Sequence, residues 1–198
     1  MSDTADYYKG PDLSYIETAS GGKFYAGNPT FDVIDISLAL AKNCRFNGHT
    51  SLFYSVAQHS LMVAAIMEID GHDGLEGLLH DATEAYLTDV PAPLKQFLPD
   101  FKLLDGQWET KLRQKYGLPP HKSEACQRAD WIALFIEAKY MMMSEGATFV
   151  DPKNLRETAL TEPKYRHLHN WIIERKWYDV ARDFRVTFYT YTGVRGGR

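Results

Sequence analysis

Apolar residues recur at helical rather than alternating spacing along most of the chain. Breakers such as Asp70-Gly71 and Pro91-Ala92-Pro93 separate the apolar stripes. The expected helices cover residues 33–42, 53–69, 75–87, 99–116, 119–144, 163–175 and 176–188, with a short segment at 91–97. The aromatic and β-branched stretch 186–191 leaves partly extended backbone as an alternative there.

The first 30 residues have a different composition from the rest of the chain. They are rich in Gly, Ser, Asp and Tyr and contain the breakers Gly21-Gly22 and Asn28-Pro29. We therefore predict an irregular N-terminal arm at 1–30 with short extended pieces. The whole chain of 198 residues is 44% hydrophobic and 24% charged, which is ordinary for one globular core. The predicted fold class is all-α, with a single helical domain at 31–198.

Charge and composition exclude several classes of partner. With 22 basic and 26 acidic residues, the formal net charge of −4 argues against nucleic acid as a partner. The longest apolar runs, at 61–67 and 131–136, are too short to cross a bilayer, so we expect no membrane partner. Cys44 and Cys126 are far apart, which favours reduced thiols. We expect a cytoplasmic protein, in the host cytoplasm if the source is viral.

Four polar residues occupy positions within the predicted apolar stripes, namely His59, the pair His80-Asp81, and Asp130. Burial is costly for such groups, and a divalent cation can satisfy several of them together. Taken singly, a histidine at such a position is more often a hydrogen-bonded core residue. Because consecutive helical residues diverge by about 100°, His80 and Asp81 can share an ion only at the shoulder of their helix. Such a ligand set suits Mn, Fe, Co, Ni or Zn without choosing among them.

The order of these residues resembles the H…HD…D motif of HD-domain phosphohydrolases. Together the four positions outweigh the structural interpretation of each one alone. The resemblance covers about residues 31–140 and includes four blocks: RFNGHT at 45–50, YSVAQHS at 54–60, HDATEA at 80–85 and DVPAPLK at 89–95. These blocks are similar to the YfbR-type 5'-deoxynucleotidase branch, which includes DatZ-like dATP triphosphohydrolases of phages. The resemblance implies that the helical domain is an HD-domain bundle.

The resemblance also assigns roles to individual residues. It implies metal ligation by His59, His80, Asp81 and Asp130. Glu84, four residues after His80 and so on nearly the same helix face, would orient or deprotonate the attacking water. Arg45 would act in catalysis by holding the phosphate. The residues expected to contact substrate are Arg45, Phe46, His49, Asp89, Pro91 and Lys95. Phe46 departs from the Trp that relatives often carry beside the sugar, which leaves the exclusion of ribose in doubt.

The expected function is metal-dependent hydrolysis of deoxynucleotides. The favoured reaction releases deoxyadenosine and triphosphate from dATP, and the alternative releases phosphate from deoxynucleoside monophosphates. The cofactor would be a divalent transition metal (Co, Mn, Zn, Fe or Ni), and a second divalent ion is compatible with the site. Relatives form dimers or larger rings, so a homo-oligomer is expected.

Other classes fit the residues less well. An alarmone hydrolase usually carries Asp where this chain has Ala85. A cyclic-dinucleotide phosphodiesterase would need a lysine and further ligands after the HD pair, where Thr83 and Glu84 lie. A noncatalytic nucleotide sensor would not need Glu84. A purely structural helical protein gives no reason to bury the four candidate ligands.

Overall fold

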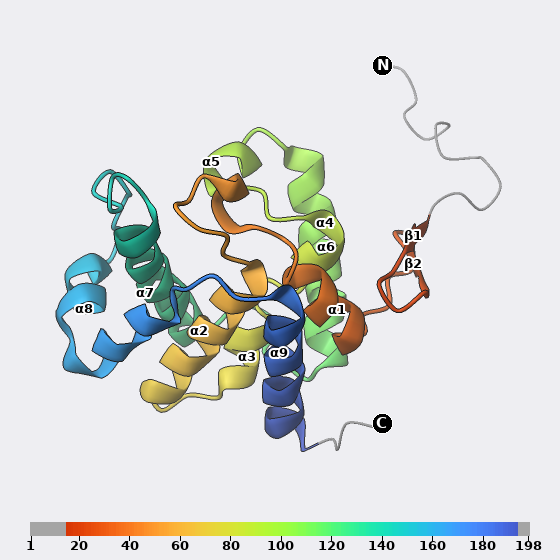
Figure 1. Ribbon diagram of the computed structural model, residues 1–198. Coiled ribbons are helices and arrows are strands. Elements are labelled where there is room, and N and C mark those ends of the chain that lie inside the picture. Colours follow the sequence, from red (N-terminus) through yellow and green to blue (C-terminus); the bar gives the residue numbers. More distant parts are fainter. Residues whose placement is uncertain (1–14, 194–198) are drawn as a thin grey trace.

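The computed structural model describes residues 15–193, and these residues are mostly helical. The predicted all-α fold class is confirmed (Figure 1). The α-helices are α1 (Val33–Leu40), α2 (Val56–Ile69), α3 (Gly74–Leu79), α4 (Glu84–Leu87), α5 (Ala92–Lys95), α6 (Pro99–Lys115), α7 (Glu124–Met141), α8 (Leu155–Thr161) and α9 (Trp177–Thr192). Two 3-10 helices, η2 (Arg45–Gly48) and η3 (Pro163–Trp171), and two strands, β1 (Tyr15–Glu17) and β2 (Lys23–Tyr25), complete the described elements. Within residues 15–193, no helix is both long and apolar enough to cross a membrane.

The described part of the N-terminal arm is a small antiparallel hairpin at the edge of the molecule, beside α1 (Figure 1). Its β2 residue Phe24 is 1% exposed and stacks on Tyr86 with ring centroids 3.9 Å apart. Trp108 of α6 donates a hydrogen bond of 3.2 Å to the Ala26 carbonyl. These contacts attach the hairpin to the helical domain. The predicted extended pieces are confirmed here, and residues 1–14 of the predicted arm lie outside the described residues.

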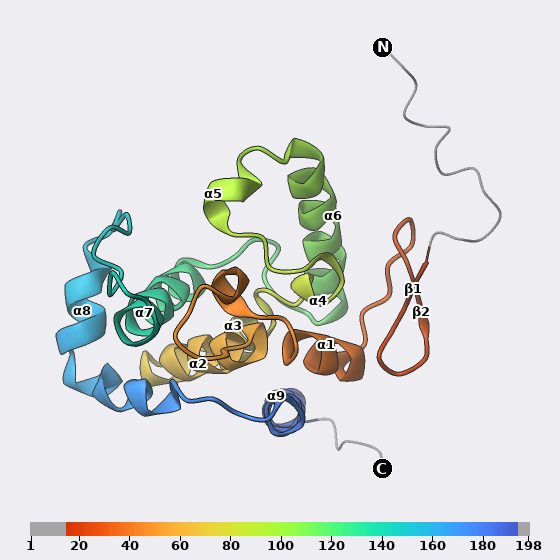
Figure 2. The same ribbon diagram turned by 45° about the horizontal axis from the view of Figure 1, so that its top comes forward.

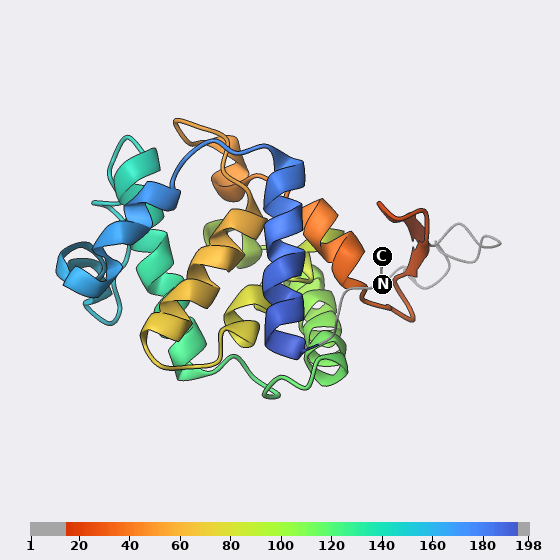
Figure 3. The ribbon, with the colours of Figure 1, turned by 60° about the horizontal axis from the view of Figure 1, so that its bottom comes forward.

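Helix α2 is central to the helical domain. A capping box begins it, in which Ser55 accepts a hydrogen bond from the Gln58 amide and the Gln58 side chain accepts one from the Ser55 amide. Its residues are buried on nearly all sides, as expected for a helix enclosed by neighbours. Figure 3 shows α2, in gold, between α7 on one side and α9, in blue, on the other. In Figure 2, α2 and α3 lie between α6 and the α7–α8 pair.

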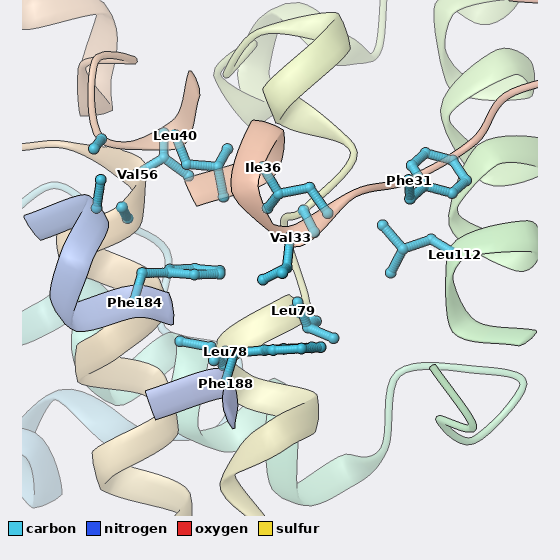
Figure 4. Close-up of a cluster of buried hydrophobic side chains, with 14 of the residues drawn as sticks. Phe31, Val33, Ile36, Leu40, Val56, Leu78, Leu79, Leu112, Phe184 and Phe188 are labelled. Carbon is cyan, nitrogen blue, oxygen red and sulfur yellow. The ribbon is translucent and has the colours of Figure 1, made fainter. Parts of the chain in front are cut away.

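The larger apolar cluster joins α1, α2, α3, α6 and α9, as Figure 4 shows for ten labelled residues. Helix α3 approaches α2 closely at Gly77, where a Cβ atom would lie 2.9 Å from the Ala64 nitrogen. A larger residue at Gly77 would therefore push α3 away from α2. This close approach brings the end of α3 next to the polar residues of α2.

The third predicted helix, 75–87, is wrong as a continuous element. Helix α3 ends at Leu79, and α4 begins only at Glu84. The residues between them form tight turns, in which the Ala82 amide donates to the Leu79 carbonyl and the Glu84 amide to the Asp81 carbonyl. The Asn43 side chain donates to the Glu84 carbonyl at 2.8 Å, a tertiary contact that local sequence does not specify. His80 and Asp81 thus lie at a break between helices rather than at the shoulder of one helix.

Several other boundaries also differ from the predictions. Helix α2 begins three residues later than expected and α7 begins at Glu124, because Ser55 and Ser123 cap them. The predicted helix 163–175 is a 3-10 helix that ends at Trp171, and α8 was not predicted. Helix α9 runs through the stretch 186–191, so extended backbone there is wrong. The predicted helices 33–42 and 99–116 are confirmed within two residues.

A buried ion pair holds the segment between α6 and α7. Arg113 of α6 is 2% exposed and pairs with Glu76 of α3, which is 5% exposed. Glu76 also accepts hydrogen bonds from the Ser123 amide at 2.9 Å and the Ser123 hydroxyl at 2.6 Å. Arg113 donates to the carbonyls of Pro119 and His121. Three helices and the 119–123 segment therefore meet at one charged cluster.

We predict that Arg113→Met destabilises the protein by about 3–5 kcal/mol, because Glu76 is left buried without its partner. Urea unfolding measures this difference. Burial opposes ionisation, but the Ser123 and Arg113 hydrogen bonds lower the pKa of Glu76. The destabilisation is thus expected in full above about pH 4.3 and should shrink as the pH falls through the lowered pKa. Arg182→Met, at a side chain 60% exposed, is the control and should change stability by no more than about 1 kcal/mol. Equal losses for both variants would contradict the prediction.

Candidate metal centre

The four predicted ligands come together from three parts of the fold. His59 lies on α2, Asp130 on α7, and His80 and Asp81 at the break after α3. The Nε2 atoms of His59 and His80 are 3.3 Å apart. Asp130 Oδ1 lies 3.1 Å from His59 Nε2, and Asp81 Oδ2 lies 2.9 Å from His80 Nε2. His59, His80 and Asp130 can hold a metal ion, since their donor atoms all lie within 4.8 Å of one another.

The Nδ1 atom of each histidine already makes a hydrogen bond within the protein. His59 Nδ1 lies 2.7 Å from Glu137 Oε1, and His80 Nδ1 lies 2.8 Å from the Gly77 carbonyl oxygen. A carboxylate and a carbonyl only accept hydrogen bonds, so each Nδ1 carries the proton. In the neutral rings, both Nε2 lone pairs then face each other and two carboxylates, an arrangement that a shared divalent cation satisfies. The donor set therefore fits a metal ion.

The carboxylates around His59 favour a positive charge between the two histidines. Burial and the charge of Arg45 oppose protonation of His59, but Glu137 and Asp130 raise its pKa to about 9. Burial also opposes ionisation of Asp130, yet the hydrogen bond from His59 and the charges of His80 and Lys122 lower the pKa of Asp130. Protons and metal ions compete for the same histidine nitrogens.

Glu137 is a candidate for supporting the metal site that the sequence did not predict. It is fully buried on α7 and accepts hydrogen bonds from His59 and, at 3.1 Å, from Arg45 Nη2. Burial raises the pKa of Glu137, but the charges of His59 and Arg45 outweigh this and lower it. The signal was present, because Glu137 follows Asp130 by seven residues and so lies two turns further along the same helix face. One carboxylate thus orients both a candidate ligand and the predicted phosphate-binding arginine.

Arg45 and Phe46 are placed by a strained turn, η2. Phe46 and Asn47 have φ angles of 54° and 52°, in the left-handed region that non-glycine residues rarely adopt. Such conformations cost on the order of 1–2 kcal/mol per residue, and the surrounding contacts must compensate them. The Arg45 amide donates to the Tyr54 carbonyl at 2.9 Å, which fixes the start of the turn. Arg45 Nη1 then lies 3.9 Å from Asp81 Oδ2, beside the metal ligands.

A cavity of about 610 Å³ opens beside these residues. Its charged lining residues are Arg45, Asp81, Glu84, Asp89, Lys95, Lys122 and Asp130. Its apolar lining residues include Phe46, Val90, Pro91, Trp131, Leu134, Phe149 and Val150. All the predicted substrate residues except His49 therefore line the cavity. His49 is exposed at the end of η2 and is not among the lining residues, so the structure does not place it in this site.

Glu84 lines the cavity but reaches it differently from the prediction. The helix break, rather than one continuous helix face, places its carboxylate near the ligands. Glu84 is 5% exposed, with Oε1 3.3 Å from Lys95 Nζ, while no hydrogen-bond partner for Oε2 is found within the described residues. Burial and the negative charges of Asp81 and Asp89 raise the pKa of Glu84 well above its usual range. This carboxyl group is suited to accept and return a proton.

Lys122 is a second residue that the sequence reading missed. It precedes the Ser123 cap of α7, and its Nζ lies 3.5 Å from Asp130 Oδ2 and 3.8 Å from Asp81 Oδ1. Burial opposes its charge, but Asp81 and Asp130 raise the pKa of Lys122 above its ordinary value. A lysine in a loop with no regular spacing to the ligands offered no sequence signal.

The fold and site together define a helical protein with a candidate metal centre beside a charged and partly apolar cavity. The chain is 42% identical over 138 residues to the uncharacterized protein YfdR of Escherichia coli, covering 68% of this chain and 76% of YfdR. It is 32% identical over 136 residues to the uncharacterized protein RCAP_rcc00048 of Rhodobacter capsulatus, covering 61% of this chain and 69% of that protein. The chain belongs to the family of these two proteins. No protein-family model matches it.

We predict that Glu137→Gln weakens the binding of Co²⁺ by about 10–100-fold, because Gln cannot accept from both His59 and Arg45 as a charged carboxylate does. Isothermal titration calorimetry of the metal-free protein with Co²⁺ measures the affinity. Glu124→Gln, an exposed position on the same helix, is the matched control and should bind Co²⁺ as the unmodified protein does. Unchanged Co²⁺ affinity in Glu137→Gln would show that the hydrogen bond to His59 does not support metal binding.

Proposed function

We propose that this protein is a metal-dependent phosphohydrolase that acts on deoxynucleotides. The observation that carries the proposal is the convergence of two facing histidine nitrogens with groups that line one cavity: two aspartates, a largely buried arginine, and a buried carboxyl group with an unpartnered oxygen. A purely structural core gives no reason to place these groups together. The resemblance to HD-domain phosphohydrolases assigns a role to each of them.

His59, His80, Asp81 and Asp130 would hold the divalent ion. When bound, such an ion supplies Lewis acidity toward a phosphoryl oxygen and a water molecule. Arg45 binds a phosphoryl oxygen through its planar guanidinium, which Glu137 holds in place. Arg45 lines the cavity, so the part of its guanidinium that faces the cavity would donate to the substrate.

Glu84 moves the protons of the reaction. The oxygen of water attacks the phosphorus next to the 5'-oxygen of the sugar, and the Glu84 carboxylate, in its ionised form, accepts the proton that this water loses. The bond between phosphorus and the 5'-oxygen then breaks. The leaving 5'-oxygen takes up a proton and departs as the hydroxyl group of the deoxynucleoside. Glu84, with its raised pKa, can return the proton at this step.

The apolar side of the cavity suits the sugar and base of a nucleotide. Phe46, Trp131, Leu134 and Phe149 give it aromatic and aliphatic surface, and Asp81 and Asp130 of the candidate metal centre also line it. A volume of about 610 Å³ lies within the usual range of small-molecule sites. Such a lining would bind the aromatic base against the apolar residues and the phosphate near Asp81 and Asp130. Pro91 and Asp89 would flank the base and sugar.

The favoured substrate is dATP, from which the reaction releases deoxyadenosine and triphosphate. Three basic side chains, Arg45, Lys95 and Lys122, line the cavity and offer charge for a phosphate chain. One observation favours deoxynucleoside monophosphates instead. Lys95 Nζ already donates a hydrogen bond to Glu84 at 3.3 Å, so it has less capacity to bind a further phosphate. The same bond breaks in both reactions, and only the phosphate product differs.

We predict that the purified protein with Co²⁺ or Mn²⁺ releases deoxyadenosine from dATP, with dAMP as the alternative substrate. Chromatography of the nucleoside and of the phosphate product identifies the reaction. Glu84→Gln should lower kcat by about 10²–10⁴-fold while keeping the metal, because it removes proton transfer but no ligand. Nucleotide binding without turnover in the unmodified protein would instead identify a noncatalytic sensor. Full activity in Glu84→Gln would remove this residue from the mechanism.

A further inference from the structure

Lys122 occupies a distinctive position at the candidate metal centre. Asp130 Oδ1 and Asp81 Oδ2 face the two histidines, whereas Lys122 Nζ approaches the other oxygen of each carboxylate. Arg45 Nη1 lies 3.9 Å from Asp81 Oδ2, so two cations approach different oxygens of Asp81. The candidate centre therefore has a cation on each side of this ligand.

The contacts of Lys122 are long for bonds that would fix its position. Its Nζ lies 3.5 Å and 3.8 Å from the two carboxylate oxygens, whereas charge-assisted bonds of this kind are usually about 2.7–2.9 Å. An ammonium group has three N–H donors, and only one hydrogen bond, to Asp130, is found for Lys122 Nζ among the described residues. Its side chain is 27% exposed and lines the cavity. Donors thus remain to bind an anion there.

The backbone at Lys122 is held firmly although its side chain is not. Ser123 is bound to Glu76 through both its amide and its hydroxyl, and the His121 carbonyl accepts from Arg113 at 2.9 Å. The Gln127 side chain donates to the Lys122 carbonyl at 2.9 Å. A buried ion pair such as that of Glu76 and Arg113 contributes little net stability compared with apolar packing. Arg113 and Glu76 bind His121 and Ser123, the two neighbours of Lys122 in the sequence. Placement of Lys122 explains these contacts better than a contribution to stability does.

We propose that Lys122 is a substrate-binding residue whose ammonium group binds a phosphoryl oxygen, across Asp81 from Arg45. This inference rests on the proposed function and names the part of the substrate that the site recognises. Lys95, one of the predicted substrate contacts, lies closer to Glu84, at 3.3 Å, than Lys122 lies to either of its carboxylates. Lys122 is therefore the better candidate for contact with the phosphate chain.

The test separates anion binding from metal binding. Calorimetry measures the affinity of Co²⁺ alone for the protein, and then the affinity of tripolyphosphate and of inorganic phosphate for the Co²⁺-loaded protein. Lys122→Met should weaken the binding of tripolyphosphate by about tenfold or more, because a charge-assisted hydrogen bond is lost. Its Co²⁺ affinity should stay within about threefold of the unmodified protein. Lys122→Arg, which keeps the charge, should retain most of the anion affinity.

Lys111→Met, at an exposed lysine of α6, is the matched control and should bind both probes as the unmodified protein does. If Lys122→Met loses Co²⁺ affinity, Lys122 supports the carboxylates rather than the substrate, and the proposal is overturned. Unchanged anion affinity in Lys122→Met also overturns it. Anion binding that depends on Lys122 without turnover of any nucleotide would leave this subsite standing and refute the proposed function. Nucleotide turnover by the unmodified protein, with unchanged anion binding in Lys122→Met, would support the proposed function and refute the Lys122 subsite.

Discussion

Two imidazole nitrogens that face each other across 3.3 Å set the main constraint on this structure. Each ring donates its other N–H to a group that only accepts, so neither neutral ring has a proton to place between them. With two aspartates beside them, His59 and His80 form an electron-rich centre inside a helical core. Burial of such a centre is costly unless a metal ion, or a proton on His59 that Asp130 accepts, joins its members. The surrounding fold can be understood as the means of holding that centre.

Each part of the fold that meets this centre departs from simple helical packing. The break between α3 and α4 turns His80 and Asp81 toward α2, and the absence of a side chain at Gly77 lets α3 come close enough. The strained turn η2 brings Arg45 to the same place, where Glu137 joins it to His59. Strain and buried charge concentrated at one cavity are typical of functional sites rather than of structural cores.

The features that the sequence predicted depend on local spacing, and the features that it missed depend on tertiary contacts. Apolar spacing predicted the all-α fold, and polar residues within the stripes predicted the group of His59, His80 and Asp130, because both signals are local and strong. Asp81 lies beside His80, and its role as a ligand stays a prediction. The break after Leu79 was missed, since no glycine or proline marks it and a distant hydrogen bond from Asn43 helps to form it. Lys122 was missed because its position beside Asp81 and Asp130 depends on a loop that is held by Arg113 and Glu76. His49 is not among the residues that line the cavity, and its role stays a prediction, because a position in the loop beside Arg45 does not specify the direction of a side chain.

The central claim is that one cation joins the two facing histidines to both aspartates. Anomalous X-ray diffraction from crystals of the protein soaked in Co²⁺ tests it most directly. The account predicts a strong peak about 2.0–2.2 Å from the Nε2 atoms of His59 and His80, with oxygens of Asp81 and Asp130 also coordinated. Ordered crystals with no ion at this position, and with the two rings turned so that their Nε2 atoms bind other groups, would contradict it.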